Sequence, residues 1–218
     1  MKTGVFYRQE QSSVSAGGRG VLAEKVVVTW QGAATELGAR LHHEALRRGL
    51  GRALQVEAAG DGAPWIWNLV GERWAQAVPV LDFYHASQHL WELGRALHPK
   101  DDKAAAQWVR ARRRRLRHGE ERAVLQEIAQ LQAGRGERGQ IVRREQNYFA
   151  GHAGRMAYEQ IAQRGWPIGS GAVESACRQR QCRYKRSGQF WTESGLRHLG
   201  ALEEARANGH WDELWSTE

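Results

Sequence analysis

Short strand-forming runs alternate with helical patterns over the first 100 residues, and this alternation limits what the chain can fold into. Residues 26–30 and 78–81 are rich in β-branched and apolar residues, as is typical of buried strands. Between them, apolar residues recur every four positions over 33–45, which predicts a helix. Further strands are predicted over 4–7 and 53–58. Strands that alternate with helices indicate a layered α/β fold.

After Pro99 the pattern changes, and residues 100–165 predict helices only. A loop over 166–171 precedes a basic helix predicted from 172 to 185. We therefore predict three parts: residues 1–99, a helical insertion over 100–165, and residues 166–218 with a helical tail. Ser and Gly residues predict a loop over 12–20, and Trp211 and Trp215, spaced four apart, predict a last helical turn docked on the body.

Composition narrows the class of protein. Hydrophobic residues make up 41 % and charged residues 26 % of the 218 residues, a balance typical of a globular protein rather than a disordered one. The sequence contains no apolar run of the roughly 18–20 residues that a membrane span needs, so no membrane partner is expected. Cys177 and Cys182 lie among basic residues, which argues against a disulfide-stapled secreted fold. A cytoplasmic location is the expectation.

Basic residues are concentrated in the second half of the chain. The 32 Lys and Arg against 24 Asp and Glu give a net charge of +8. Residues 1–100 hold 11 basic and 9 acidic residues, and residues 101–200 hold 20 and 10. The two densest runs are Arg110, Arg112, Arg113, Arg114, Arg115 and Arg117, and then Arg178, Arg180, Arg183, Lys185 and Arg186.

Two interpretations of these runs remain open. Guanidinium groups bind phosphate bidentately and release condensed counterions, so an Arg-rich helix suits a nucleic-acid backbone. A solvated helix face is the alternative for any single Arg run. Two runs in one half of the chain favour nucleic acid.

Three acidic residues stand out by position. Asp61 and Asp82 each follow a predicted strand, and the strand–helix–strand step between them brings them to one edge of a sheet. Glu174 lies in the first turn of the basic helix. A cluster of carboxylates binds Mg²⁺, and two such ions activate the attacking oxygen and stabilise the leaving oxygen in phosphodiester chemistry.

Each acid, taken singly, also has a purely structural interpretation. Asp61 with Gly62 forms a turn, and Asp82 caps a helix that begins at Phe83. Glu174 pairs with Arg178 one helical turn away.

Two candidate zinc motifs are set aside. His85 and His89 share a helix face but lack a third ligand, so a structural role is favoured for His89. Cys177 and Cys182 have no matching pair of ligands elsewhere in the sequence.

Several strings resemble the DDE transposases of bacterial insertion sequences of the ISKra type, which are related to Mutator-like transposases. The match runs from about Met1 to the C-terminus. The strings that carry it are residues 61–67 (DGAPWIW), 81–85 (LDFYH), 167–177 (PIGSGAVESAC), 185–191 (KRSGQFW) and 209–215 (GHWDELW).

The resemblance implies a ribonuclease-H-like core and assigns roles. Asp61 matches the second acid of the catalytic triad and Glu174 the last, and together they would hold two Mg²⁺ ions with the first acid. Asp82 and His85 match a motif that supports the site rather than binding metal. Residues 100–165 correspond to the insertion before the last acid. The implied partners are the transposon ends and target DNA, and a homo-oligomer is compatible with the family.

The resemblance departs at the front. In this family the first Asp lies on the first strand, upstream of a segment similar to residues 2–8, and no position of the 218 residues matches it. We therefore expect a core without its first, central strand, so that the second and fourth strands meet directly or leave backbone groups unpaired. We also expect an inactive C-terminal part of a transposase, which would be catalytic if translation starts upstream.

Two alternatives stay open. The chain is a non-catalytic DNA-binding remnant that interferes with an intact transposase, or it is a generic basic α/β protein without nuclease ancestry. The ordered strings argue against the latter.

Overall fold

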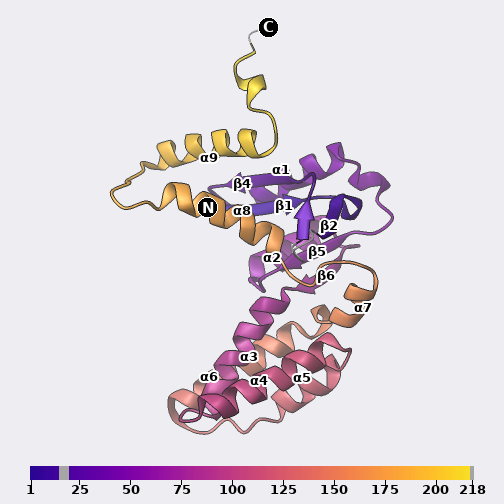
Figure 1. Cartoon of the computed structure of the whole chain (residues 1–218), viewed down its shortest axis with the longest axis vertical. Helices are drawn as coiled ribbons and strands as arrows, with labels where there is room; N and C mark the ends of the chain where they lie inside the picture. Colours follow the sequence, from indigo (N-terminus) through magenta and orange to yellow (C-terminus); the bar gives the residue numbers. More distant parts are fainter. Residues whose placement is uncertain (15–19, 217–218) are drawn as a thin grey trace. The chain divides into compact units, whose positions relative to one another are not determined.

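Strands and helices alternate over the first half of the chain, as predicted, and the protein is an α/β protein. The structure is a computed structural model that describes residues 1–14 and 20–216 (Figure 1). It divides into two compact units. We call Met1–Leu54, Gly71–Trp74 and Gly171–Glu218 the sheet unit, and Gln55–Val70 and Ala75–Ser170 the bundle unit. The three-part organisation predicted above is not tested by this division and stays a prediction.

The sheet unit is built on an antiparallel pair of strands. β1 pairs with β4 from Lys2↔Trp30 to Phe6↔Val26. The elements of this unit are β1 (Lys2–Phe6), η1 (Gln9–Gln11), β2 (Ser12–Val14), β3 (Gly20–Leu22), β4 (Val26–Trp30), α1 (Ala34–Arg47), η2 (Leu50–Arg52), α8 (Gly171–Tyr184), α9 (Glu193–Ala207) and η4 (Asp212–Leu214). Helix α2 (Pro64–Arg73) begins in the bundle unit and ends in the sheet unit.

Two expectations for the sheet unit are corrected. Residues 12–14 and 20–22 pair as the strands β2 and β3, so the predicted loop over 12–20 is wrong at both ends, and its residues 15–19 lie outside the described part. The two strands pair antiparallel from Ser12↔Leu22 to Val14↔Gly20, and backbone hydrogen bonds of this kind need no apolar pattern. The C-terminal tryptophans are not docked, because Trp211 and Trp215 pack edge to face on each other and remain 40 % and 67 % exposed.

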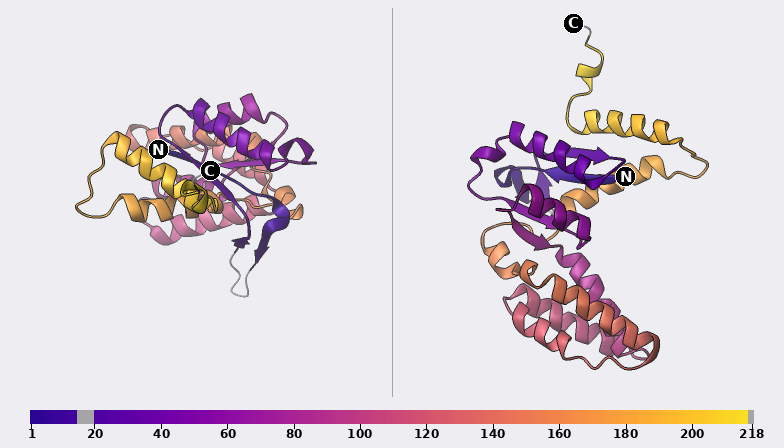
Figure 2. Two further views of the ribbon diagram at one scale, coloured as in Figure 1. Left: turned by 90° about the horizontal axis from the view of Figure 1, so that it is seen from above. Right: turned by 180° about the vertical axis from the view of Figure 1, so that it is seen from behind.

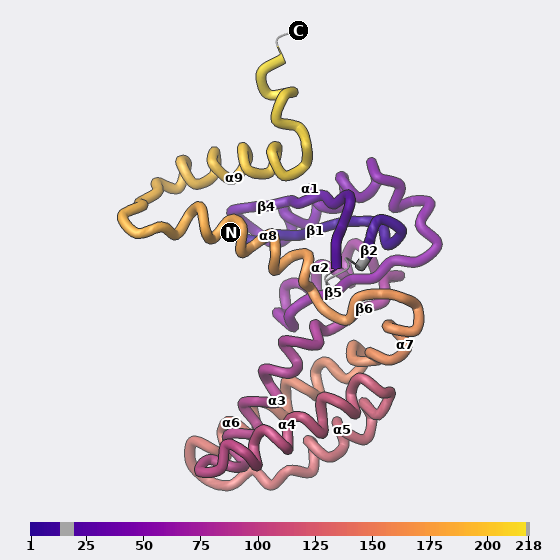
Figure 3. Tube along the Cα trace, in the orientation of Figure 1, coloured from indigo at the N-terminus to yellow at the C-terminus, as the bar shows by residue number. Residues whose placement is uncertain are grey.

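Strand β4 is covered on both faces. Val26, Val27 and Val28 are all buried although successive side chains of a strand point to opposite faces. Helix α1 packs on β1 and β4, while α8 runs beside β1 and α9 beside β4 (Figure 3). Leu37 of α1 supplies part of this core.

The outer edge of β4 is closed by side chains of α9 rather than by another strand. The Val27 N–H donates to Asn208 Oδ1 at 2.8 Å, and Asn208 Nδ2 donates to the Val27 carbonyl oxygen at 3.0 Å. The Thr29 N–H donates to Glu204 at 2.7 Å. These bonds satisfy backbone groups that an unpaired edge would expose. Among the described strands, β1 pairs only with β4, so no strand lies at its other edge.

The bundle unit joins two parallel strands to a group of helices. β5 pairs with β6 from Glu57↔Val78 to Gly60↔Leu81. Its elements are β5 (Glu57–Gly60), β6 (Val78–Leu81), α3 (Phe83–Leu97), α4 (Asp102–Arg117), α5 (Glu121–Ala129), α6 (Gly136–Gly151), η3 (Ala153–Arg155) and α7 (Tyr158–Gln163). β5 starts later than the predicted 53–58, because the pairing partner begins at Val78 and Leu54 is fully exposed.

Residues 100–165 form helices and turns only. Helices α3, α4, α5 and α6 pack side by side (Figure 2). Their facing stripes make one apolar core, because each helix repeats apolar residues at three- and four-residue intervals. The most buried members are Leu90, Leu93, Val109, Leu116, Val124, Ile128 and Phe149. Within the described ranges, no helix is both long and apolar enough to cross a bilayer.

Candidate functional site

The turn after β5 holds Asp61. Asp61 is exposed, and its Oδ1 accepts the Ala63 N–H at 3.0 Å. This bond confirms the turn predicted at Asp61 and Gly62. This bond occupies only one of the two carboxylate oxygens. Gly62 has φ +95°, and an added Cβ would lie 2.9 Å from the Tyr148 hydroxyl. The turn therefore requires glycine next to Asp61.

Helix α6 supports this turn. The Tyr148 hydroxyl donates to the Asp61 carbonyl oxygen at 3.5 Å. The Tyr148 ring stacks on His89 with 3.5 Å between ring centroids and meets His152 edge-on at 4.7 Å. Burial, with the nearby carboxylates of Asp61, Glu145 and Asp82, raises the pKa of Tyr148, so the hydroxyl stays a neutral donor.

A buried carboxylate, that of Glu145, anchors the same cluster. Glu145 is fully buried and bonds His89 Nδ1 at 2.5 Å and Arg144 Nε at 2.6 Å. Burial by itself raises the pKa of Glu145, but its hydrogen bonds and charge attraction to His89 and Arg144 outweigh burial, and the net pKa is lowered. The contacts of His89 are those of a structural residue that ties α3 to α6.

His152 completes the support of the turn. Its ring is mostly buried, and Arg155 lies 2.9 Å from its Nδ1. Burial and the positive charge of Arg155 lower the pKa of His152, which keeps the ring neutral near pH 7. Sequence reasoning missed Tyr148 and His152. Their i, i+4 spacing was a usable signal, but nothing in one sequence connects that spacing to Asp61.

Asp82 is fully buried at the start of α3 and accepts four hydrogen bonds. Its Oδ1 accepts the N–H groups of Tyr84 at 2.6 Å and His85 at 3.2 Å. Its Oδ2 accepts the Ser170 N–H at 2.6 Å and the Ser170 hydroxyl at 2.5 Å. Both carboxylate oxygens are therefore occupied. The helix-capping interpretation of Asp82 is realised, and the residue also fixes a segment 88 positions away.

The residues around Ser170 are held to the start of α3 by a second bond. The Phe83 N–H donates to the Ile168 carbonyl oxygen at 2.9 Å. Gly169 lies against Tyr84, since an added Cβ would be 3.1 Å from that ring. The His85 side chain is half-buried, and its imidazole makes no hydrogen bond or ion pair with the described residues.

The structure brings Asp61 and Asp82 to one end of the β5–β6 pair. Each directly follows a paired residue, Gly60 and Leu81, and the Asp82 N–H donates to the Gly60 carbonyl oxygen at 2.8 Å. Glu174 belongs to the sheet unit, where it is exposed in the first turn of α8. The expected pairing of Glu174 with Arg178 is not among the ion pairs of the described residues.

The carboxylates near the end of the β5–β6 pair differ in how many oxygens they can offer to Mg²⁺. Over residues 1–14 and 20–216, no three His, Cys, Asp or Glu side chains are grouped to hold a metal ion. Asp82 has no oxygen left to offer, and Asp61 has one oxygen engaged. Burial also raises the pKa of Glu57 in β5 to about 8, so this carboxyl is mostly neutral at pH 7. We therefore derive no step through the ion.

The Arg run on α4 separates into paired and exposed members. Arg112 bonds Glu127 at 3.2 Å, and Arg115 bonds Glu120 at 2.7 Å and Glu127 at 2.5 Å. Arg113 is half-buried and donates to Ser87 at 3.0 Å. The exposed members are Arg110, Arg114 and Arg117. Their spacing of four and three residues puts them on one helix face.

The second basic run continues from α8 into the following loop. Arg178, Lys185 and Arg186 are exposed, Arg180 is buried, and Arg183 pairs with Glu203. Residues 175–192 hold five Lys and Arg and no Asp or Glu. This segment is therefore the most uniformly positive part of the sheet unit.

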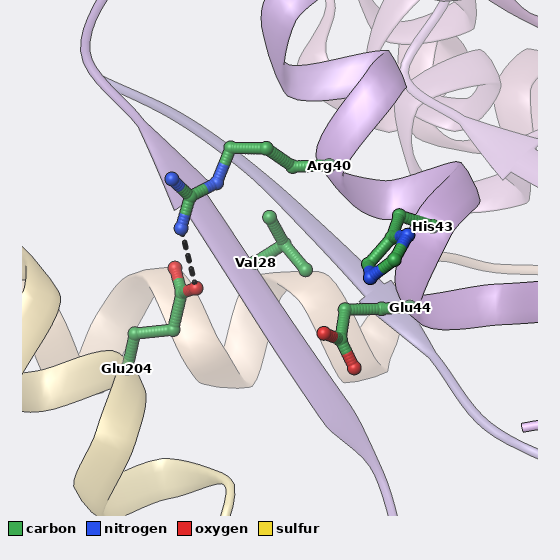
Figure 4. A pocket seen from close by; sticks show the side chains of 5 residues that line it. All are labelled: Val28, Arg40, His43, Glu44 and Glu204. Atoms are coloured by element: carbon green, nitrogen blue, oxygen red, sulfur yellow. Dashed lines mark hydrogen bonds and ion pairs between the residues drawn. The ribbon is translucent and has the colours of Figure 1, made fainter. Parts of the chain in front are cut away.

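A small cavity of about 160 Å³ lies between α1, β4 and α9 (Figure 4). Its polar groups are engaged in the fold, because Arg40 bonds Glu204 at 3.1 Å and Glu204 also accepts the Thr29 N–H. The lining residues are Val28, Arg40, His43, Glu44 and Glu204. We do not assign a function to this cavity.

Comparison with protein-family models, with curated proteins and with solved structures found no match for this chain.

Proposed function

We propose that the chain is part of a DDE transposase of the ISKra type, with a ribonuclease-H-like core and DNA as its partner. The observation that carries the proposal is the set of hydrogen bonds between Asp82 and Ser170. They join two of the resembling strings, 81–85 and 167–177, which are far apart in sequence. A turn or cap that served only its own helix would not need the second string.

The strand pairing also supports a ribonuclease-H-like core. Such a sheet has an antiparallel pair followed by parallel strands that end in acids, and β1–β4 and β5–β6 have these directions. In such a fold a first strand lies between the strands that correspond to β1 and β5. Within the described residues, β1 and β5 each have a strand partner on one edge only.

Residues 1–218 carry matches to two of the three acids, so we expect this chain alone to bind DNA without cleaving it. The test is nicking of supercoiled plasmid in Mg²⁺, with a chelator control. Absence of nicking together with DNA retention is expected. Nicking that Asp61→Ala and Glu174→Ala both abolish would contradict the expected inactivity and support the catalytic assignment. Nicking that survives both variants would contradict the assignment of these acids.

A second candidate is a purely DNA-binding role that interferes with an intact transposase. The exposed arginines Arg110, Arg114 and Arg117 of α4 favour it, because they can contact DNA without any contribution from the acids. Competition with an active transposase of the same family for its terminal DNA would distinguish it. Inhibition that follows DNA affinity supports interference, and no inhibition at saturating chain concentration excludes it.

The exposed arginines of α4 are the proposed contacts to duplex DNA. Changing Arg110, Arg114 and Arg117 to Gln removes three cations that could each neutralise a phosphate. We expect the slope of log affinity against log salt to become shallower by about 3, at about 0.9 per phosphate, with weaker binding at low salt. Fluorescence anisotropy with a labelled duplex over a salt series measures this.

A charge-matched control is available in the same unit. Arg122, Arg135 and Arg138 are also exposed and make no ion pair with the described residues. Their triple change to Gln alters net charge equally, and we expect the slope to stay within 1 of the unaltered chain. Equal effects of the two triple variants would show that only net charge acts and would remove α4 as the contact surface.

A further inference from the structure

The loop between α8 and α9 carries an exposed aromatic residue a few positions after two exposed cations. Phe190 is 95 % exposed. Full burial of such a side chain would stabilise the fold by about 2–3 kcal/mol, so its exposure is a cost that the fold does not recover. Lys185 and Arg186 lie in the same loop and are exposed as well.

Hydrogen bonds within this loop hold residues 186–189 in a turn. The Gln189 N–H donates to the Arg186 carbonyl oxygen at 3.1 Å, and the Arg186 N–H donates to Gln189 Oε1 at 3.2 Å. Gly188 has φ +78°, a conformation that favours glycine. Trp191 Nε1 donates to the Tyr184 carbonyl oxygen at 3.1 Å and closes the turn. Phe190 is thus presented by an ordered backbone.

The exposed cations of the loop, Lys185 and Arg186, favour an anionic ligand. Arg186 Nε is fixed by the Cys182 carbonyl oxygen at 3.0 Å, which leaves its remaining guanidinium nitrogens to other acceptors. With no acid between residues 175 and 192, the segment is suited to a polyanion. Base stacking on an aromatic ring is largely independent of sequence, and arginines beside the ring hold the phosphates.

We propose that the 185–191 loop binds unpaired nucleotides, with one base stacked on Phe190 and the adjoining phosphates held by Lys185 and Arg186. Bases inside a duplex are already stacked on each other, so the ring would select single-stranded ends, flaps or bulges. A lipid surface is less suited to this loop. Interfacial binding takes an amphipathic helix with a broad apolar face, and α8 exposes mainly polar and charged residues. The inference extends the proposed function, since it assumes DNA as the partner.

The test measures affinity for a single-stranded oligonucleotide and for a hairpin duplex by anisotropy, without divalent metal. We expect Phe190→Ala and Phe190→Leu to weaken single-strand binding about 5- to 100-fold, the range that corresponds to about 1–3 kcal/mol per stacked base. Duplex affinity should stay within about twofold. Phe190→Trp should restore single-strand binding, because it keeps an aromatic face.

Trp215→Ala is the matched control. Trp215 is the other strongly exposed aromatic residue of the sheet unit, but acidic Asp212 and Glu213 precede it. We expect no change in single-strand affinity. Photo-crosslinking from an oligonucleotide with 5-iododeoxyuridine should give an adduct on Phe190.

Four outcomes would overturn the inference. No effect of Phe190→Ala, or an equal loss for duplex and single strand, removes the stacking site while DNA binding by the chain still stands. Retention on anionic phosphatidylserine vesicles that depends on Phe190, with unchanged oligonucleotide affinity, would assign the ring to a lipid surface. If the chain retains no DNA of either kind, the proposed function fails together with this inference.

Discussion

Replacing Asp82 with Ala should lower the free energy of unfolding of the bundle unit by about 3 kcal/mol. The change removes a cap, which costs about 1 kcal/mol, and also strips a charged acceptor from buried donors. Ser170 loses both of its bonds, and the start of α3 loses two. Asp82→Asn should lose nearly as much, since its amide N–H₂ would face other donors.

The measurement is native-state hydrogen exchange, because it reports on α3 and on residues 168–170 separately from the sheet unit. Asp101→Ala is the matched control. Asp101 caps α4 through the Ala104 N–H at 2.9 Å, but it is exposed and bonds no distant segment. We expect it to cost about 1 kcal/mol. If Asp82→Ala costs no more than Asp101→Ala, the bond to Ser170 contributes nothing to stability.

Replacing His89 with Ala should also destabilise the bundle unit by about 3 kcal/mol. Glu145 would remain fully buried with Arg144 as its one charged partner, and removal of one member of a buried pair leaves a poorly compensated charge. His210→Ala is the control, because His210 pairs at 2.9 Å with an exposed carboxylate, Glu213. Its loss should be within about 0.5 kcal/mol of zero.

The effect of His89→Ala should depend on pH in a defined direction. The pKa of Glu145 is lowered in the folded chain, so its contribution is complete above the usual pKa of about 4.5 and is lost as pH falls through the folded value. Without His89, burial should raise that pKa, and the Glu145 side chain would take up a proton at higher pH. Urea unfolding between pH 4 and pH 7 should show the two proteins converge at low pH. A difference that does not change with pH would assign the loss to packing alone.

Local signals in the sequence predicted much of the fold. The basic helix predicted over 172–185 is α8, Gly171–Tyr184, and the helix predicted from Phe83 is α3. A cap was one of the two interpretations of Asp82, and local sequence allows it because the cap and the helical period lie within a few residues of each other. The parallel step from β5 to β6 also followed from its strand–helix–strand pattern.

Long-range contacts could not be predicted in the same way. Glu145 is 56 residues from His89, and no motif marks Glu145 as the partner of that histidine. The β2–β3 pair was missed because its pairing comes from backbone bonds rather than an apolar pattern. The sequence also could not predict which arginines of α4 are exposed. Their exposure depends on ion pairs with Glu120 and Glu127, which lie beyond the Arg run. The roles of Asp61 and Glu174 in catalysis stay predictions.

Because hydrogen bonds from α9 and its C-cap occupy the outer edge of β4, a further strand cannot be added to the β1–β4 sheet at that edge. Asn208 meets Val27 with one donor and one acceptor, as a neighbouring strand would, so the C-terminal helix occupies the place of a strand without offering a new edge. Any extended segment that joins this sheet must do so at β1. Helix α9 thus blocks the edge of β4, and it prevents association of chains by strand pairing at that edge.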